Sequence, residues 1–177
     1  MSTYALDANI ISFYLKGNTS VIDNIEKAIS EDHSIVIAPI AYYEVKRGLM
    51  MINAVKQMRK LEILCNLFPV GELGDYLLEE SIKIYVQERK AKRNTEDADI
   101  FIAAFCIHND CMRRVHTPPF RAFKKGMYPE TNTLPKQHTP SLQGGVVDFI
   151  LVTDNVKHFQ NIADLRLVNW KMAIKSE

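Results

Sequence analysis

Few cysteines and no long apolar run limit the class of protein that this sequence can encode. Three cysteines stand among 177 residues, and an odd number without a disulfide-framework spacing fits a reducing compartment better than a secreted domain. No stretch approaches the roughly twenty apolar residues of a membrane span, and the N-terminal residues lack a signal-peptide pattern. We therefore expect a cytoplasmic protein that does not associate with a membrane.

The chain also lacks an excess of charge of either sign. Its formal net charge is +1 and its sequence pI is about 7.7, whereas many nucleic-acid-binding domains are strongly basic. A nucleic-acid function must therefore rest on local features. No internal repeat is present, and the 47% of hydrophobic residues suits one domain over residues 1–177 that buries about two-thirds of its extended surface.

Hydrophobic periodicity predicts an alternation of strands and helices. Strands are expected at 4–6, 35–38, 149–153 and 167–168, with a further short one at 68–70. Helices are expected at about 10–15, 21–29, 40–50, 54–67, 76–93, 97–108 and 157–162, with Ser20 capping the second and Asn94 or Thr95 the sixth. This order predicts an α/β fold with a mostly parallel sheet of about four to five strands and helices on both faces.

One segment does not fit this alternation. Residues 109–147 are rich in Pro, Thr, Gln and basic residues without clear periodicity, and about forty residues are too many for an ordinary connection. We interpret the segment as an irregular insertion. Its basic residues stand among aromatic ones, which suits RNA contacts, and a disordered loop or one that packs in a dimer is an equal alternative. The RNA-binding candidates in it are Arg113, Arg114, Lys124 and Lys125.

Acidic residues follow the predicted strands. Asp7 and Asp154 come directly after two strands, Glu44 lies in the first turns of the helix after another, and Asp99 lies near the start of the apolar helix. In open parallel sheets the loops at the carboxyl ends of the strands converge and bind ligands. We therefore expect these acids, together with Asn155, to meet at one edge of the sheet.

Crowded carboxylates repel one another unless a cation neutralises them. Oxygen ligands without an adjacent His or Cys favour Mg²⁺ or Mn²⁺ over zinc, and such an ion can activate a water for attack on a phosphodiester. Each acid also has a simpler interpretation, Asp7 as an N-cap and Glu44 and Asp99 as solvated residues of a first helical turn. Their combination favours a metal site.

Four segments resemble, in order, the motifs of PIN domains, and most closely those of the VapC toxins of bacterial toxin–antitoxin pairs. They are LDANIISFYLKG, IAPIAYYEVKRGL, DADIFIAAFCI and ILVTDNVKHFQNIADLRLVNW, and the matched stretches cover residues 4–109 and 149–170. The resemblance implies a PIN-like fold, a homodimer and inhibition by a cognate antitoxin. It also implies Mg²⁺- or Mn²⁺-dependent endoribonuclease activity on structured RNA such as tRNA.

The same motifs imply roles for single residues. The three acids at positions 7, 44 and 99 match the metal-binding acids, Asn9 the polar residue after the first acid, and Thr153 the hydroxyl residue before the last site position. That last position is Asp in many relatives but Asn155 here, while Asp154 stands one place earlier. The fourth ligand is therefore either Asp154 or Asn155.

Basic residues near the acids are a weaker signal. Lys46 and Arg47 follow the second acid, and Arg93 ends a basic run before the third. We count them as RNA-binding candidates, although charge runs more often form a solvated helix face. The cysteines and histidines between Cys106 and His138 match no standard zinc spacing.

Two other functions stay open at this point. A phosphatase or phosphotransferase with Asp7 as nucleophile would also place an acid at the end of the first strand. Such enzymes commonly have a second Asp two residues on, where this chain has Asn9. The other alternative is a catalytically silent binding module of the same fold, and retention of all three acids speaks against it.

Overall fold

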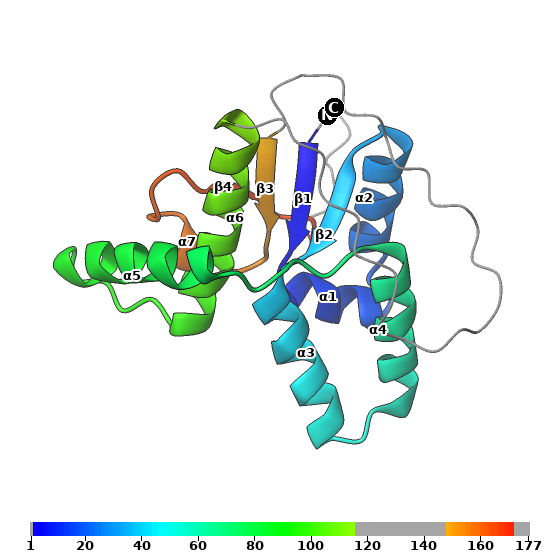
Figure 1. Cartoon of the computed structure of the whole chain (residues 1–177). Coiled ribbons are helices and arrows are strands. Elements are labelled where there is room, and N and C mark those ends of the chain that lie inside the picture. The colour runs from blue at the N-terminus through cyan, green and yellow to red at the C-terminus, as the bar shows by residue number, and fades with distance from the viewer. Residues whose placement is uncertain (1, 116–147, 172–177) are drawn as a thin grey trace.

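A parallel sheet lies at the centre of the fold (Figure 1), which a computed structural model describes over residues 2–115 and 148–171. In these ranges the sheet has four strands in the order β2-β1-β3-β4, and every neighbouring pair is parallel. The strands are β1 (Ser2–Leu6), β2 (Ser34–Ile37), β3 (Asp148–Val152) and β4 (Arg166–Val168). The predicted α/β fold with a mostly parallel sheet is confirmed.

Helices cover both faces of this sheet. Neighbouring residues of a strand point to opposite faces, and both are fully buried at Ala5 and Leu6 of β1 and at Leu151 and Val152 of β3. The helices of the described ranges are α1 (Ala8–Leu15), α2 (Thr19–Ser30), α3 (Pro39–Met51), α4 (Val55–Leu67), α5 (Asp75–Lys90), α6 (Asp97–Val115) and α7 (Val156–Phe159). No helix of these ranges is long and apolar enough to cross a membrane.

Four helices end where the chain enters the left-handed backbone region. Gly17, Asp32, Asn53 and Lys92 follow the ends of α1, α2, α3 and α5, with φ of 80°, 59°, 50° and 58°. In each case the next amide N–H donates back to a carbonyl in the last turn of the helix, which satisfies the end of the helix. Glycine marks only the first of these ends, so only that end has a clear signal in the sequence.

Several predicted boundaries were wrong for local reasons. Asn18, not Ser20, caps α2, because its side chain accepts from the Val21 amide, while the Ser20 hydroxyl donates to the Trp170 carbonyl. The Thr95 hydroxyl, expected as a cap of α6, instead donates to Glu88 Oε2 over 2.7 Å. The strand expected at 68–70 is a single bridge between Ile37 and Val70.

The largest difference concerns the predicted insertion. Helix α6 does not end near residue 108 but continues to Val115, so the irregular segment begins later than expected. Asp110, on this extension, accepts a hydrogen bond of 3.0 Å from the Phe149 amide and ties the helix to β3. The predicted insertion otherwise falls on residues 116–147, which lie outside the described residues.

Candidate functional site

The carboxyl ends of β1 and β3 bring Asp7 and Thr153 together. Leu6 pairs with Val152 in adjacent parallel strands, so the residues that follow them are neighbours. The Thr153 hydroxyl donates to Asp7 Oδ2 over 2.6 Å, and the Asp7 amide donates to the Val152 carbonyl over 3.1 Å. These two strand ends therefore meet at one edge of the sheet, as the sequence predicts.

The Asp7 carboxylate is almost completely buried and hydrogen bonded. Asp7 is only 4% exposed. Its Oδ1 accepts from the Ala8 amide over 2.6 Å, so Asp7 also serves as the N-cap of α1. Burial raises the pKa of Asp7, against the lowering effect of its hydrogen bonds from Thr153, Ala8 and Asn9, and the charge of Asp99 raises it further. The fold thus keeps a carboxylate where its negative charge is costly.

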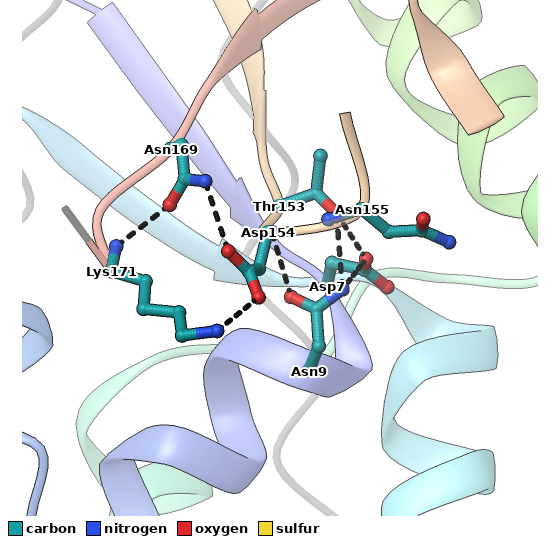
Figure 2. Close-up of polar contacts among 7 residues, drawn as sticks. All are labelled: Asp7, Asn9, Thr153, Asp154, Asn155, Asn169 and Lys171. Atoms are coloured by element: carbon teal, nitrogen blue, oxygen red, sulfur yellow. Dashed lines mark hydrogen bonds and ion pairs between the residues drawn. The ribbon is translucent and has the colours of Figure 1, made fainter. Parts of the chain in front are cut away.

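Asn9 connects the two strand ends (Figure 2). Its Nδ2 donates to Asp7 Oδ2 over 2.7 Å and to Thr153 Oγ1 over 3.1 Å, while its Oδ1 accepts from the Asp154 amide over 3.0 Å. Thr153, fully buried, also accepts from the Asn155 amide over 2.9 Å. This network fixes the orientation of the Asp7 carboxylate from two sides.

Glu44 of α3 and Asp99 of α6 complete a group of acids whose charges act on one another. The pKa of Glu44 is raised by burial and by the charge of Asp7, lowered by Arg47, and raised again by Asp99 and Glu96. The pKa of Asp99 is raised by burial, lowered by His158, and raised by Glu96. The negative charge of Asp99 thus acts on Asp7, and the charges of both act on Glu44.

His158 and Glu96 are neighbours of the acids that sequence reasoning missed. His158 Nδ1 lies 2.8 Å from Asp99 Oδ2, and half of its side chain is exposed. The short helix α7 directly follows Asn155, so its first turn had to lie at the same edge of the sheet. His158 could therefore have been predicted near the acids from its place in the VKHF segment. For Glu96 the sequence offered only its nearness to Asp99.

The structure separates the two candidates for the fourth site position. Asp154 accepts from Asn169 Nδ2 over 3.0 Å and pairs with Lys171 Nζ over 2.7 Å. The hydrogen bond from Lys171 lowers the pKa of Asp154. In Figure 2 the side chains of Asp154 and Asn155 point in opposite directions, and Asp154 faces the Asn169 and Lys171 side. Asp154 thus has a cationic partner of its own, which sequence reasoning did not identify.

The oxygen atoms at this edge are of the type that binds a hard divalent cation, but their arrangement is not that of a formed coordination site. Within residues 2–115 and 148–171, no three His, Cys, Asp or Glu side chains are arranged so that they could hold a metal ion as they stand. Asp7, Glu44 and Asp99 supply carboxylate oxygens, the ligands that Mg²⁺ and Mn²⁺ prefer. Their raised pKa values mark an electrostatic cost that a bound cation would remove.

The basic candidates take different places in the structure. Arg93 pairs with buried Glu88, with Nη2 at 2.5 Å from Oε1, so its guanidinium has a structural role. Lys46 Nζ donates to the Tyr42 hydroxyl over 2.6 Å, and Arg47 Nη2 lies 3.8 Å from Glu44 Oε1. The side chains of Arg113 and Arg114, and Lys124 and Lys125 altogether, lie outside the described residues.

A groove of about 250 Å³ begins beside Glu44, between α1, α3 and α4. Its apolar walls come from Leu15, Val45, Leu49 and Ile52. Gly48 also lines the groove, and apart from its own helix no atom would lie within 4 Å of a Cβ added there. Of the three acids, Glu44 therefore adjoins this largely apolar groove.

Comparisons with known proteins identify the fold. No protein-family model and no curated protein matches the chain. Solved structures do match, among them VapBC2 from Rickettsia felis bound to a promoter DNA fragment, with a TM-score of 0.69 and 18% identity over 95% of this chain and 98% of that one. VapBC-1 from nontypeable Haemophilus influenzae matches with a TM-score of 0.65 and 21% identity over 96% and 99%. FitAcB from Neisseria gonorrhoeae matches with a TM-score of 0.62 and 18% identity over 94% and 97%.

These similarities confirm the fold that the sequence motifs implied. The matches cover nearly the whole length of both chains, and the four-stranded parallel sheet flanked by helices is the PIN-like fold of the VapC-type neighbours. Identities of 18–21% make this a likeness of fold alone.

Proposed function

We propose that this chain is a divalent-metal-dependent endoribonuclease of the VapC type, which hydrolyses phosphodiester bonds in structured RNA such as tRNA. The observation that carries the proposal is the group formed by Asp7, Glu44 and Asp99 from three separate parts of the chain. The charge of Asp99 raises the pKa of Asp7, and the charges of both raise the pKa of Glu44. Their place at the carboxyl ends of parallel strands is where such sheets bind ligands. The PIN-like fold supports the same conclusion.

The three acids would hold Mg²⁺ or Mn²⁺, with Asn155 as a further oxygen donor. When bound, the ion supplies a water of lowered pKa and neutralises charge on the phosphate. The protein's own contribution is positional: Thr153 and Asn9 hold the Asp7 carboxylate, and His158 holds that of Asp99. Asp154 is engaged by Lys171, which favours Asn155 for the fourth position.

Cleavage of purified tRNA in Mn²⁺ tests the proposal directly. Asp7→Asn and Asp99→Asn each remove a charged ligand with little change of shape, so we expect cleavage to fall by about 100-fold or more. Mn²⁺ binding, measured by calorimetry, should weaken in the same variants. Asp97→Asn, which changes an exposed acid two positions before Asp99 in α6, is the matched control and should cleave normally.

The same preparations separate the two alternatives. The hydrogen bonds of Asp7 do not separate the two chemistries, because Oδ1, which accepts from the Ala8 amide, keeps a second lone pair that could bind a metal ion or attack phosphorus. Mass spectrometry after incubation with acetyl phosphate would detect a phosphorylated Asp7, and its appearance would contradict the nuclease. Wild-type protein that binds Mn²⁺ and RNA without cleaving any RNA would instead identify a silent binding module.

We also propose an antitoxin partner and a homodimer, since VapBC complexes pair the toxin with an antitoxin. Large apolar side chains stand exposed at the α3–α4 turn and along α5, and contiguous exposed apolar surface commonly marks a protein interface. They include Met51, Ile52 and Val55 in the first group and Leu78 and Ile82 in the second. Light scattering should give twice the 20.3 kDa mass of the chain, and a monomer at all concentrations would contradict the dimer.

A further inference from the structure

An exposed aromatic side chain stands beside the group of acids. Tyr43, the residue before Glu44 in α3, is 57% exposed. The guanidinium carbon of Arg47 lies 5.0 Å from the centre of the Tyr43 ring, and Arg47 Nη2 lies 3.8 Å from Glu44 Oε1. A ring, a cation and a carboxylate thus occupy one stretch of the surface.

Helix geometry explains this arrangement. Arg47 follows Tyr43 by four positions and Glu44 by three, and side chains at both spacings are neighbours on a helix. Arg47 therefore lies between the ring and the acid. Its side chain is 56% exposed and its contact with Glu44 is long, so the ion pair is a weak surface one and leaves the guanidinium able to take another anionic partner.

We propose that Tyr43 and Arg47 form a stacking platform for an RNA base next to the bond that is cut. The inference rests on the proposed ribonuclease function and names two residues that would hold its substrate. An exposed ring can stack on any base, because every base has a π face, and a neighbouring arginine adds charge for the phosphate. A cation bound by Glu44 would also free Arg47 for the RNA backbone.

A second pair in the same chain provides a control. Tyr85 and Arg89 of α5 have the same spacing, the guanidinium carbon lies 4.8 Å from the ring centre, and Tyr85 is 41% exposed. Arg47 lowers the pKa of Glu44, whereas no α5 residue contributes to the pKa shift of any of the three acids in the described ranges. Figure 1 shows α3 and α5 extending from the sheet in different directions.

The experiment measures binding of a short single-stranded RNA that carries 2-aminopurine, with Ca²⁺ as the only divalent ion and intact RNA verified on a gel. Stacking quenches 2-aminopurine fluorescence, and anisotropy of a terminal dye reports the affinity. The proteins are wild type, Tyr43→Leu, Tyr43→Phe and Tyr85→Leu. We expect Tyr43→Leu to lose the quenching and bind about tenfold more weakly, while Tyr43→Phe, which keeps the ring, and Tyr85→Leu match wild type.

The outcomes distinguish this inference from the proposed function. If Tyr43→Leu quenches and binds like wild type, the platform is wrong, and cleavage of tRNA by wild type in Mn²⁺ would still support the nuclease. If wild type binds RNA without cleaving it, the nuclease is wrong and the Tyr43→Leu comparison still decides the platform. Wild type that binds no RNA overturns both. A Tyr43→Leu variant that loses its dimer but keeps RNA affinity assigns Tyr43 to a protein contact and overturns the inference.

Discussion

The Thr153 hydroxyl donates a hydrogen bond of 2.6 Å to Asp7 Oδ2, although 146 positions separate the two residues. The same hydroxyl accepts from Asn9 and from the Asn155 amide, in a fully buried position. Thr153→Val keeps the shape but removes all three hydrogen bonds of this hydroxyl, so we expect the free energy of unfolding to fall by about 1–3 kcal/mol. Urea denaturation measures it, and Thr153→Ser, which keeps the hydroxyl, should lose less. Equal stability of the Val variant and wild type would show that the bond does not hold the strand ends.

The raised pKa of Glu44 predicts how metal-free stability depends on pH. Burial and the charge of Asp7 raise this pKa, so the folded protein holds the proton more tightly than the unfolded chain. Stability then falls as pH rises from the ordinary glutamate range near 4.3 through the folded-state value. Glu44→Gln removes this loss, and in a chelator it should unfold at a higher temperature than wild type at pH 7. Thermal unfolding should show the difference closing towards pH 4, and a difference of equal size at both pH values would mean that ionisation of Glu44 is not its cause.

Glu88 and Arg93 predict the opposite dependence on pH. Hydrogen bonds from Arg93 lower the pKa of Glu88, whose side chain is buried. The stability that this contributes is present above the ordinary glutamate pKa and is lost as pH falls through the folded-state value. Arg93→Ala leaves a buried carboxylate without its cation, so its unfolding temperature should lie below that of wild type at pH 7 and approach it in acid. The double variant Glu88→Gln, Arg93→Ala should be more stable than Arg93→Ala alone; if it is not, the ion pair is not the cause.

Replacing two glycines with alanine should change the stability of the fold in opposite directions. Gly17 has a φ of 80°, and an alanine there is forced into the left-handed region, so we expect Gly17→Ala to destabilise by about 1 kcal/mol. Gly48 lies within α3, and outside its own helix no atom lies within 4 Å of an added Cβ, so Gly48→Ala should stabilise by about 0.5–1 kcal/mol. Chemical denaturation of the two variants checks both. Equal effects would mean that packing, not backbone conformation, decides these positions.

Much of the fold could be predicted because apolar periodicity and strand-end acids are local signals. The elements around Asp7, Glu44 and Asp99 appear at the expected places, and the order of strands and helices implies the parallel sheet. Helix ends at Asp32 and Lys92 could not be predicted, since a non-glycine residue in the left-handed region leaves no mark in composition. The extension of α6 was hidden because its polar sequence after residue 108 looks like the start of a loop.

The partners of the site residues depend on tertiary contacts that no local pattern encodes. Lys171 reaches Asp154 and His158 reaches Asp99 only because β4 and α7 follow β3 at the same edge. We predicted Arg93 as an RNA-binding candidate, whereas its guanidinium pairs with the buried Glu88. Whether such a charged side chain binds a ligand or stabilises the fold can be decided only when its neighbours in the structure are known.

The central position of β3 has a consequence for synthesis of the chain. Strands β1 and β3 are neighbours, yet β3 is synthesised about 7 to 30 s after β1 at ordinary translation rates of about 5–20 residues per second. A chain that stops before residue 148 contains Asp7, Glu44 and Asp99 but lacks the strand that holds Asp7 through Thr153. If the proposed cleavage holds, such a truncated chain should not cleave RNA, because it lacks the Thr153 hydroxyl that orients the Asp7 carboxylate.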